Sequence, residues 1–172
     1  MNEKVLIIGA GHGLSASIAR LFAAKGMKVG LAARNIEKLA ALADEIGAST
    51  FTCDASDPDA VVGLFKAFDT DIGCPDILVY NPSSRVRGPI TEIDAAATKD
   101  ALMVSAYGAF LAAQQAAIRM LEAGSGTMLF TGASAGVKGY PRSAPFAMGK
   151  FALRGLCQSL ARELSPQNIH VA

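Results

Sequence analysis

The chain has 172 residues, of which 51% are hydrophobic and 18% charged, a balance that excludes disordered and fibrous proteins and predicts one domain over residues 1–172. A formal net charge of +1 excludes strong electrostatic attraction to nucleic acid or to an anionic membrane. Cys53, Cys74 and Cys157 form no C-x-x-C pair and the N-terminal apolar run is too short for a signal peptide or a membrane span, so we expect a cytoplasmic protein. His12 and His170 are far apart in sequence and suggest no metal site.

Short apolar runs alternate with longer helical segments along the chain. In chain order the pattern predicts a strand at 5–9, a helix at 13–25, a strand at 27–33, a helix from its cap Asn35 to residue 46, a strand at 49–53, a helix beginning near Pro58, a strand at 76–80, a helix at about 98–122, a strand at 126–132, a helix at about 144–164 and a strand from 168. Such alternation requires right-handed crossovers between parallel strands. We therefore predict an α/β fold of the Rossmann type, a doubly wound parallel sheet with helices on both faces.

The last predicted strand runs over residues 168–172 and stops there. We expect the C-terminal part of the sheet to be missing from this chain. Whatever closes the site from that side would be missing with it.

A glycine-rich segment, GAGHGLS at 9–15, lies between the first predicted strand and the first predicted helix. Gly9 permits a tight turn, and Gly11 and Gly13 allow a ligand to approach the backbone closely. The start of the following helix, at Leu14, offers free amides to a pyrophosphate. The alternative interpretation is a glycine-rich turn without a ligand.

The end of the second predicted strand carries the signal for cofactor preference. Arg34 lies close to where an NAD-dependent enzyme places an acidic residue, and no Asp or Glu occurs at positions 32–35. A guanidinium suits a 2′-phosphate, whereas a carboxylate would repel it, so NADP(H) is favoured over NAD(H). His12 can donate a hydrogen bond to a phosphate. The alternatives are that Arg34 decorates the start of a helix and that His12 is a solvated loop residue.

Six segments in the right order, namely the glycine segment, CDAS, LVYNPSS, MVSAYGAF, LFTGASAG and FAMGKFALRGL, resemble the short-chain dehydrogenase/reductase family over nearly the whole chain. The resemblance implies that Asp54 contacts the adenine ring, although a helix cap is its alternative role. It also implies that Asn81 lines the cofactor cleft and that His12 takes a position where NADP-preferring relatives carry a basic residue. Ser15 replaces the third glycine of the family motif, so we expect it to crowd the helix against the strand.

The family's catalytic groups are only partly retained. Lys150 takes the position of the lysine that holds the nicotinamide ribose, but Phe146 replaces the tyrosine that transfers the proton, and phenylalanine carries no such proton. Ser105 replaces the asparagine. Ala133 takes the position of the serine, with Ser134 as its neighbour and possible substitute.

Three tyrosines do not restore the lost hydroxyl in an obvious way. Tyr80 and Tyr107 come near the site in the family pattern, but we expect them to pack in the core. Tyr140 is expected in the loop before the last long helix.

Two functions remain open at this point. The first is an NADP(H)-dependent oxidoreductase for a carbonyl or alcohol substrate, with a proton from Ser134, from water or from a group outside the chain. The second is a catalytically impaired dinucleotide-binding protein that acts as a sensor or a partner subunit. In the family the two long helices pair across a two-fold axis, so we expect a homodimer or homotetramer. The loop cations, which either receive an anionic substrate or stay solvated, are Arg85, Arg87, Lys138 and Arg142.

Overall fold

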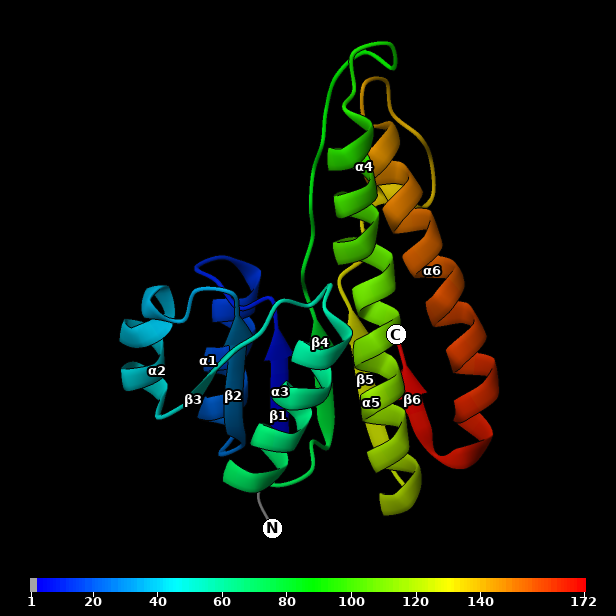
Figure 1. The fold of residues 1–172 in the computed structure, drawn as a ribbon. Coiled ribbons are helices and arrows are strands. Elements are labelled where there is room, and N and C mark those ends of the chain that lie inside the picture. Colours follow the sequence, from blue (N-terminus) through cyan, green and yellow to red (C-terminus); the bar gives the residue numbers. More distant parts are fainter. Residues whose placement is uncertain (1–2) are drawn as a thin grey trace.

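A computed structural model describes residues 3–172 and contains a six-stranded parallel sheet with helices on both faces (Figure 1). The strands are β1 (Lys4–Ile8), β2 (Lys28–Ala33), β3 (Ser49–Thr52), β4 (Ile77–Tyr80), β5 (Gly126–Phe130) and β6 (Ile169–Val171). Their spatial order is β3-β2-β1-β4-β5-β6, which is the doubly wound order with its reversal between β1 and β4. The predicted fold class is confirmed.

The helices agree with the predicted alternation, and three short 3₁₀ turns accompany them. The helices are α1 (Leu14–Ala24), α2 (Ala40–Ile46), α3 (Pro58–Asp71), α4 (Ala95–Leu102), α5 (Gly108–Ala123) and α6 (Ala144–Leu164). The helix expected to begin at Asn35 differs, because residues Glu37–Leu39 form a 3₁₀ turn before α2. Asn35 still accepts a hydrogen bond from the Glu37 amide over 3.0 Å, so it caps the turn.

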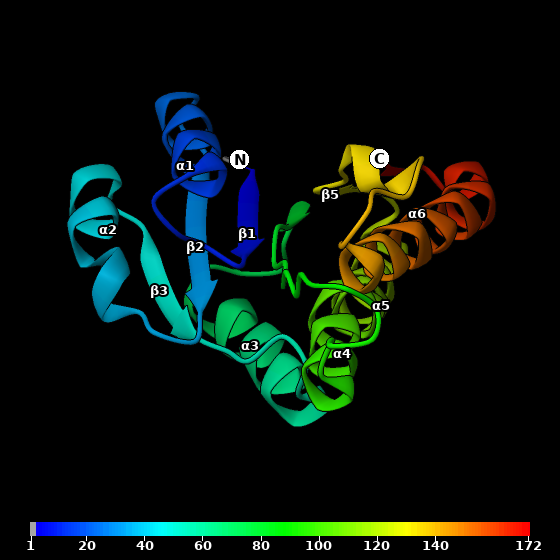
Figure 2. The same ribbon diagram turned by 90° about the horizontal axis from the view of Figure 1, so that it is seen from above.

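Alternate residues of the central strand feed two separate cores. Leu6 and Ile8 of β1 pack with α3, α5 and α6, whereas Val5 and Ile7 pack with α1 and α2. Seen from above, α1 and α3 lie on opposite sides of the strands (Figure 2). Side chains on a strand alternate between faces, so an apolar run buried on both sides is what β1 requires.

The helix predicted at 98–122 is longer and less regular than expected. Residues 95–123 are helical throughout, but Met103–Tyr107 form a π-helical turn between α4 and α5. A π turn shifts the backbone hydrogen-bond pattern, and here the buried Tyr80 hydroxyl donates to the Val104 carbonyl over 2.6 Å. The irregular turn is therefore held by a strand residue.

The same helix is the one segment of residues 3–172 long and apolar enough to cross a membrane by length and composition, with a mean hydropathy of 1.3. Of that apolar window, 44% is buried inside the protein. Core helices of α/β domains have the same character, and α5 packs here against α3 and the sheet.

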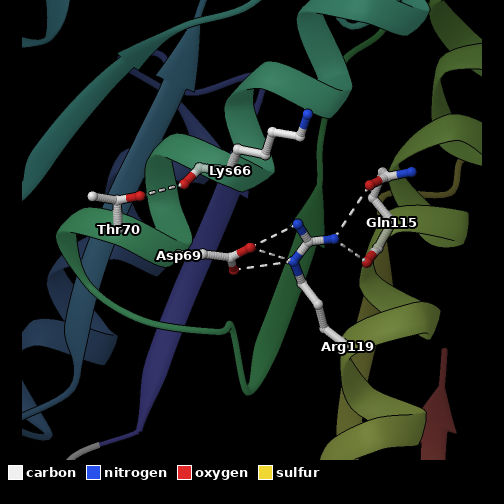
Figure 3. A network of polar contacts seen from close by, with 5 residues as sticks. All are labelled: Lys66, Asp69, Thr70, Gln115 and Arg119. Atoms are coloured by element: carbon white, nitrogen blue, oxygen red, sulfur yellow. Dashed lines mark hydrogen bonds and ion pairs between the residues drawn. The ribbon is translucent and has the colours of Figure 1, made fainter.

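A polar contact joins α3 to α5 beside this core (Figure 3). Arg119 of α5 forms an ion pair with Asp69 of α3, with an Nη2 to Oδ2 distance of 2.7 Å. Its Nη1 also donates to the Gln115 carbonyl over 2.9 Å. Since both charged side chains are mostly buried, the pair fixes the separation of the two helices.

Candidate functional site

A cleft of about 400 Å³ opens where β1, β2, β3 and β4 end. The strand order reverses between β1 and β4, and ligands of doubly wound sheets bind at such a point. The cleft is lined on its polar side by Gly9, Arg34, Lys38, Asp54 and Asn81. The structure thus brings together four cofactor residues predicted from the sequence and adds Lys38.

Gly9 makes the turn that opens the cleft. Its φ is +77°, a conformation that residues with a side chain rarely adopt. A Cβ atom at this position would lie 2.6 Å from the Pro82 nitrogen. The backbone of the loop can therefore approach the end of β4 closely only because this residue is glycine.

Ser15 stabilises the loop instead of crowding the helix against the strand. The side chain is buried, and its Oγ accepts a hydrogen bond from the Gly11 amide over 2.9 Å. The amides of His12, Gly13 and Leu14 donate to no acceptor within residues 3–172. These amides precede and begin α1, so they are free to bind an anion such as a pyrophosphate. This donor set fits a dinucleotide.

The charged side chains of the cleft lie where β2 and β3 end. Arg34 and Lys38 are exposed there, and neither forms an ion pair within the described chain. Asp54 accepts hydrogen bonds from the Ser56 amide and hydroxyl, and these bonds, with a smaller contribution from Arg34, lower the pKa of its carboxyl. The helix-cap alternative for Asp54 fails, because Asp57 caps α3.

Lys38 is the functional candidate that the sequence interpretation missed. It lines the main cleft with Arg34 and also a neighbouring hollow that contains Gly11 and the exposed His12. Lys38 comes four residues after Arg34, in the 3₁₀ turn Glu37–Leu39, and this short separation in the chain was the available signal. Lys38 therefore lies between Arg34 in the main cleft and His12 in the neighbouring hollow.

Asn81 links the glycine loop to the neighbouring strand. Its Oδ1 accepts a hydrogen bond from the Thr131 hydroxyl over 2.8 Å, and its Nδ2 donates to the Gly9 carbonyl over 3.3 Å. Lys150 reaches the same region from α6, where its ammonium donates to the Thr131 carbonyl over 2.6 Å. Asn81 and Lys150 thus meet at Thr131.

The Lys150 side chain is buried, with 3% of the residue exposed. Burial lowers the pKa of its ammonium, and the nearby charge of Arg85 lowers it further. An ordinary surface lysine would show neither effect. Within residues 3–172 no group of three potential metal ligands comes together.

Phe146, the residue at the family's tyrosine position, lies beside Lys150. Its ring centroid is 4.6 Å from Cζ of Arg85 and 6.0 Å from Nζ of Lys150. Tyr80 packs in the core as expected, and burial raises the pKa of its hydroxyl. The same expectation is wrong for Tyr107, which is 38% exposed and stacks on Phe110, because it lies on the outer side of the π turn.

Tyr140 lies exposed in the loop before α6, as predicted, with Nζ of Lys138 5.2 Å from its ring centroid.

The two serine candidates lie in different environments. Ser105 is buried in the π turn, and its Oγ accepts a hydrogen bond from the Ser84 amide over 3.4 Å. Ser134 is exposed at the start of the 3₁₀ turn Ser134–Gly136. The preceding Ala133, not Ser134, lines a second, apolar cavity of about 260 Å³ together with Lys150.

Comparison with known proteins places these features in a family. The family model for short chain dehydrogenases matches residues 3–172. D-threitol dehydrogenase of Mycolicibacterium smegmatis is 29% identical over 174 residues, covering 98% of this chain and 67% of that protein. The chain spans about two thirds of the length of such relatives.

Solved structures share the fold closely. A short-chain dehydrogenase from Rhodopseudomonas palustris is 37% identical with a TM-score of 0.94, covering 100% of this chain and 83% of the other. An actinorhodin polyketide ketoreductase with NADPH has 27% identity and a TM-score of 0.95 (99% and 68% covered). An NAD⁺-bound xylitol dehydrogenase has 27% identity and a TM-score of 0.92 (98% and 67% covered). The two cofactors thus both occur among proteins of this fold.

Proposed function

Because this chain belongs to the short-chain dehydrogenase/reductase family, we propose that it is an NADP(H)-dependent oxidoreductase acting on a carbonyl or alcohol substrate. The observation that carries the cofactor assignment is the pair of cations that line the cleft after β2, Arg34 at the strand end and Lys38 in the following 3₁₀ turn. At the end of the strand, positions 32–35 contain no carboxylate that would accept a hydrogen bond from the 2′-hydroxyl of an unphosphorylated ribose. A 2′-phosphate suits such a pair, since guanidinium and ammonium groups both bind phosphate oxygens.

The remaining contacts of the dinucleotide follow from the same cleft. The free amides of His12, Gly13 and Leu14 receive the pyrophosphate, and Asp54 accepts hydrogen bonds from the adenine end. Asn81 lines the cleft beyond them, and Lys150 binds the nicotinamide ribose. When bound, the dinucleotide supplies or accepts the hydride, and the protein supplies binding and orientation.

Proton transfer takes an unusual route in this proposal. Phe146 has no exchangeable proton, and Ser134 is exposed at the start of a 3₁₀ turn. The proton therefore comes from water at the open cleft or from a group outside the chain, while Lys150 and Ser105 are buried polar side chains of the chain itself. General acid–base assistance is worth about a hundredfold to ten-thousandfold in rate, so turnover by this chain would be slow compared with relatives that have tyrosine.

The test is a calorimetric titration of the protein with NADPH and, separately, with NADH. We expect NADPH to bind at least about tenfold more tightly, which corresponds to about 1.4 kcal/mol. Equal affinities would refute the NADP(H) assignment. Binding of neither nucleotide would refute the dinucleotide-dependent function itself.

A second candidate function is a dinucleotide-binding sensor or partner subunit with impaired chemistry. The apolar side chain of Phe146 at the tyrosine position favours it. The variant Phe146→Tyr distinguishes the two functions, because Lys150 lies close enough to lower the pKa of a new hydroxyl. Carbonyl reduction by the native protein that the variant accelerates supports the oxidoreductase. If neither protein turns over any carbonyl in a broad panel while both bind NADPH, the sensor is the better assignment.

We also propose that the protein assembles as a homodimer or homotetramer. The long helices expose apolar side chains, among them Phe110 and Ile118 of α5 and Met148 and Phe151 of α6. Exposed apolar side chains that gather on neighbouring helices are typical of interfaces. Light scattering coupled to size exclusion measures the assembly directly, and a monomer mass of 17.7 kDa at micromolar concentration would contradict the proposal.

A further inference from the structure

Arg85 and its neighbour Ser84 contact the two positions at which the chain departs most clearly from the family's catalytic residues. The amide of the preceding residue, Ser84, donates to Oγ of Ser105, which replaces the asparagine. The Arg85 guanidinium lies over the ring of Phe146, which replaces the tyrosine, at 4.6 Å from the centroid. One substitution therefore holds the backbone of this loop, and the other provides the surface on which its side chain rests.

The stacking gives the guanidinium a defined position. An aromatic ring attracts a cation to its face, and a planar guanidinium that stacks on a ring keeps the N–H groups at its edge free to donate. Ser105 and Phe146 are both buried, with 2% and 9% exposed, so neither contact is with a freely moving surface side chain. Arg85 itself is exposed and remains accessible to a ligand.

The surroundings of Arg85 contain positive charge without a partner of opposite sign. The ion pairs of residues 3–172 involve only Asp76, Glu45 and Asp69 as acids, all of them elsewhere. Lys150 has no acidic partner either, and Arg85 contributes to lowering the pKa of its ammonium. Two cations that repel each other beside one ring favour an anion between or next to them.

The adjacent loop adds to this charge. The segments 83–91 and 137–145 contain four basic residues, and the Gly88 amide donates to the Arg142 carbonyl over 3.2 Å to join them. The acids of the same loop, Glu92 and Asp94, are exposed just before α4 and form no ion pair within residues 3–172. In Figure 1 the loop before α4 and the loop before α6 lie side by side above the ends of the strands. Arg85 and Arg87 thus lie in a segment that is joined to the basic segment containing Lys138 and Arg142.

We propose that Arg85 is a substrate-anchoring residue that binds a carboxylate, so that the site takes carbonyl compounds with an acid group in preference to neutral ones. The proposal rests on the proposed oxidoreductase function and names its substrate class. A carboxylate accepts two parallel hydrogen bonds from one guanidinium. A phenylalanine at position 146 suits this role, because its apolar ring supports the guanidinium and does not compete for the carboxylate.

The experiment compares acetoacetate with its methyl ester, which keeps the ketone and removes the charge. Binding is measured by calorimetry on the whole protein with saturating NADP⁺, so that no reduction takes place. We expect Arg85→Gln to weaken acetoacetate binding at least about tenfold, the usual loss for one hydrogen-bonded charge pair, and to leave ester binding within about twofold. Thermal unfolding of each variant establishes that it is folded.

Arg87→Gln is the matched control, because it removes the same charge from an exposed position of the same loop. If Arg85 is a specific anchor, Arg87→Gln should lose less than about a third of the acetoacetate binding free energy that Arg85→Gln loses. Equal losses for Arg85→Gln and Arg87→Gln, or equal losses for acid and ester, would overturn the proposal.

The outcomes also separate this inference from the proposed function. If NADP⁺ binds and Arg85→Gln leaves the preference for the acid unchanged, the substrate class is wrong and the oxidoreductase assignment stands. If no dinucleotide binds, the titration with acetoacetate is repeated on the protein alone. Binding that depends on Arg85 then supports the anion site, and its absence overturns it.

Discussion

The hydroxyl of Thr131 donates a hydrogen bond to Oδ1 of Asn81 over 2.8 Å, and Nδ2 of the same Asn81 side chain donates in turn to the Gly9 carbonyl. Thr131 follows β5, Asn81 follows β4, and Gly9 follows β1. Three adjacent strand ends are thus connected by two side-chain hydrogen bonds at the floor of the cleft. The position of the glycine loop depends on a residue far away in the sequence.

Replacement of Asn81 by alanine tests this connection. We expect Asn81→Ala to lower the free energy of unfolding by about 1–3 kcal/mol, because it leaves the Thr131 hydroxyl and the Gly9 carbonyl without their partner. Urea unfolding of Asn81→Ala, Thr131→Val and the double variant measures it. If the two single losses simply add, the bond between these side chains contributes nothing, since a shared interaction is lost only once.

Gly108 provides a test of how α5 packs on the sheet. A Cβ atom there would collide with the Ala55 carbonyl and the Tyr80 hydroxyl. We expect Gly108→Ala to destabilise the protein by about 1–3 kcal/mol, because the buried neighbours must move. The control is Gly155→Ala in α6, where a Cβ meets no atom within 4 Å and alanine's helix propensity should add about 0.5–1 kcal/mol. Thermal or urea unfolding of both variants should therefore give changes of opposite sign.

Much of the fold could be predicted from the sequence, because its strands are near-continuous apolar runs separated by glycine, proline and capping residues. The π turn at Met103–Tyr107 could not, since residues 98–122 have the periodicity of one continuous helix. What favours the turn is the hydrogen bond from Tyr80 to the Val104 carbonyl, a contact between distant residues. Apolar periodicity contains no information about such a contact.

The candidate site likewise contains some residues that the sequence could predict and some contacts that it could not. The glycine segment, Arg34, Asp54 and Asn81 were found because each directly follows a predicted strand, and strand ends converge in a doubly wound sheet. The contact of Arg85 with Phe146 could not be predicted, because it depends on the path of an irregular loop. The bond between Ser15 and Gly11 was likewise hidden, since a serine at a glycine position suggests crowding before it suggests a hydrogen bond.

Arg34 should determine which nucleotide binds more tightly. We expect Arg34→Ala to weaken NADPH binding about tenfold or more through the lost contacts to a charged phosphate, and to leave NADH binding nearly unchanged. Lys38→Ala should act in the same direction with a smaller effect, because an ammonium is a point charge without the fork geometry of guanidinium. Calorimetric titrations with both nucleotides measure each effect. Parallel losses for NADPH and NADH would show that these cations do not contact the 2′-phosphate.

Lys150 should make stability depend on alkaline pH. Burial lowers the pKa of its ammonium in the folded protein below the ordinary 10.5, so between the two values the unfolded chain binds more protons. Stability then rises with pH across that window, and the full penalty of burying the charge applies below the folded pKa. Urea unfolding at pH values from about 8 to 10 should show a steeper rise for the native protein than for Lys150→Met. Identical slopes would mean that the ammonium is not destabilised by burial.

The π turn also determines the rotational phase of the long helix. Each residue of an α-helix advances the side-chain direction by roughly 100°, so the extra residue accommodated between α4 and α5 offsets the faces of the two segments. With this offset α5 presents its apolar stripe to the sheet while Ser105 is buried beneath the loop that carries Arg85. Deletion of a single residue from 103–107 would restore a uniform helix and turn α4 relative to α5. Because of the π turn, one continuous helix both packs α5 on the sheet and places Ser105 under the loop of the site.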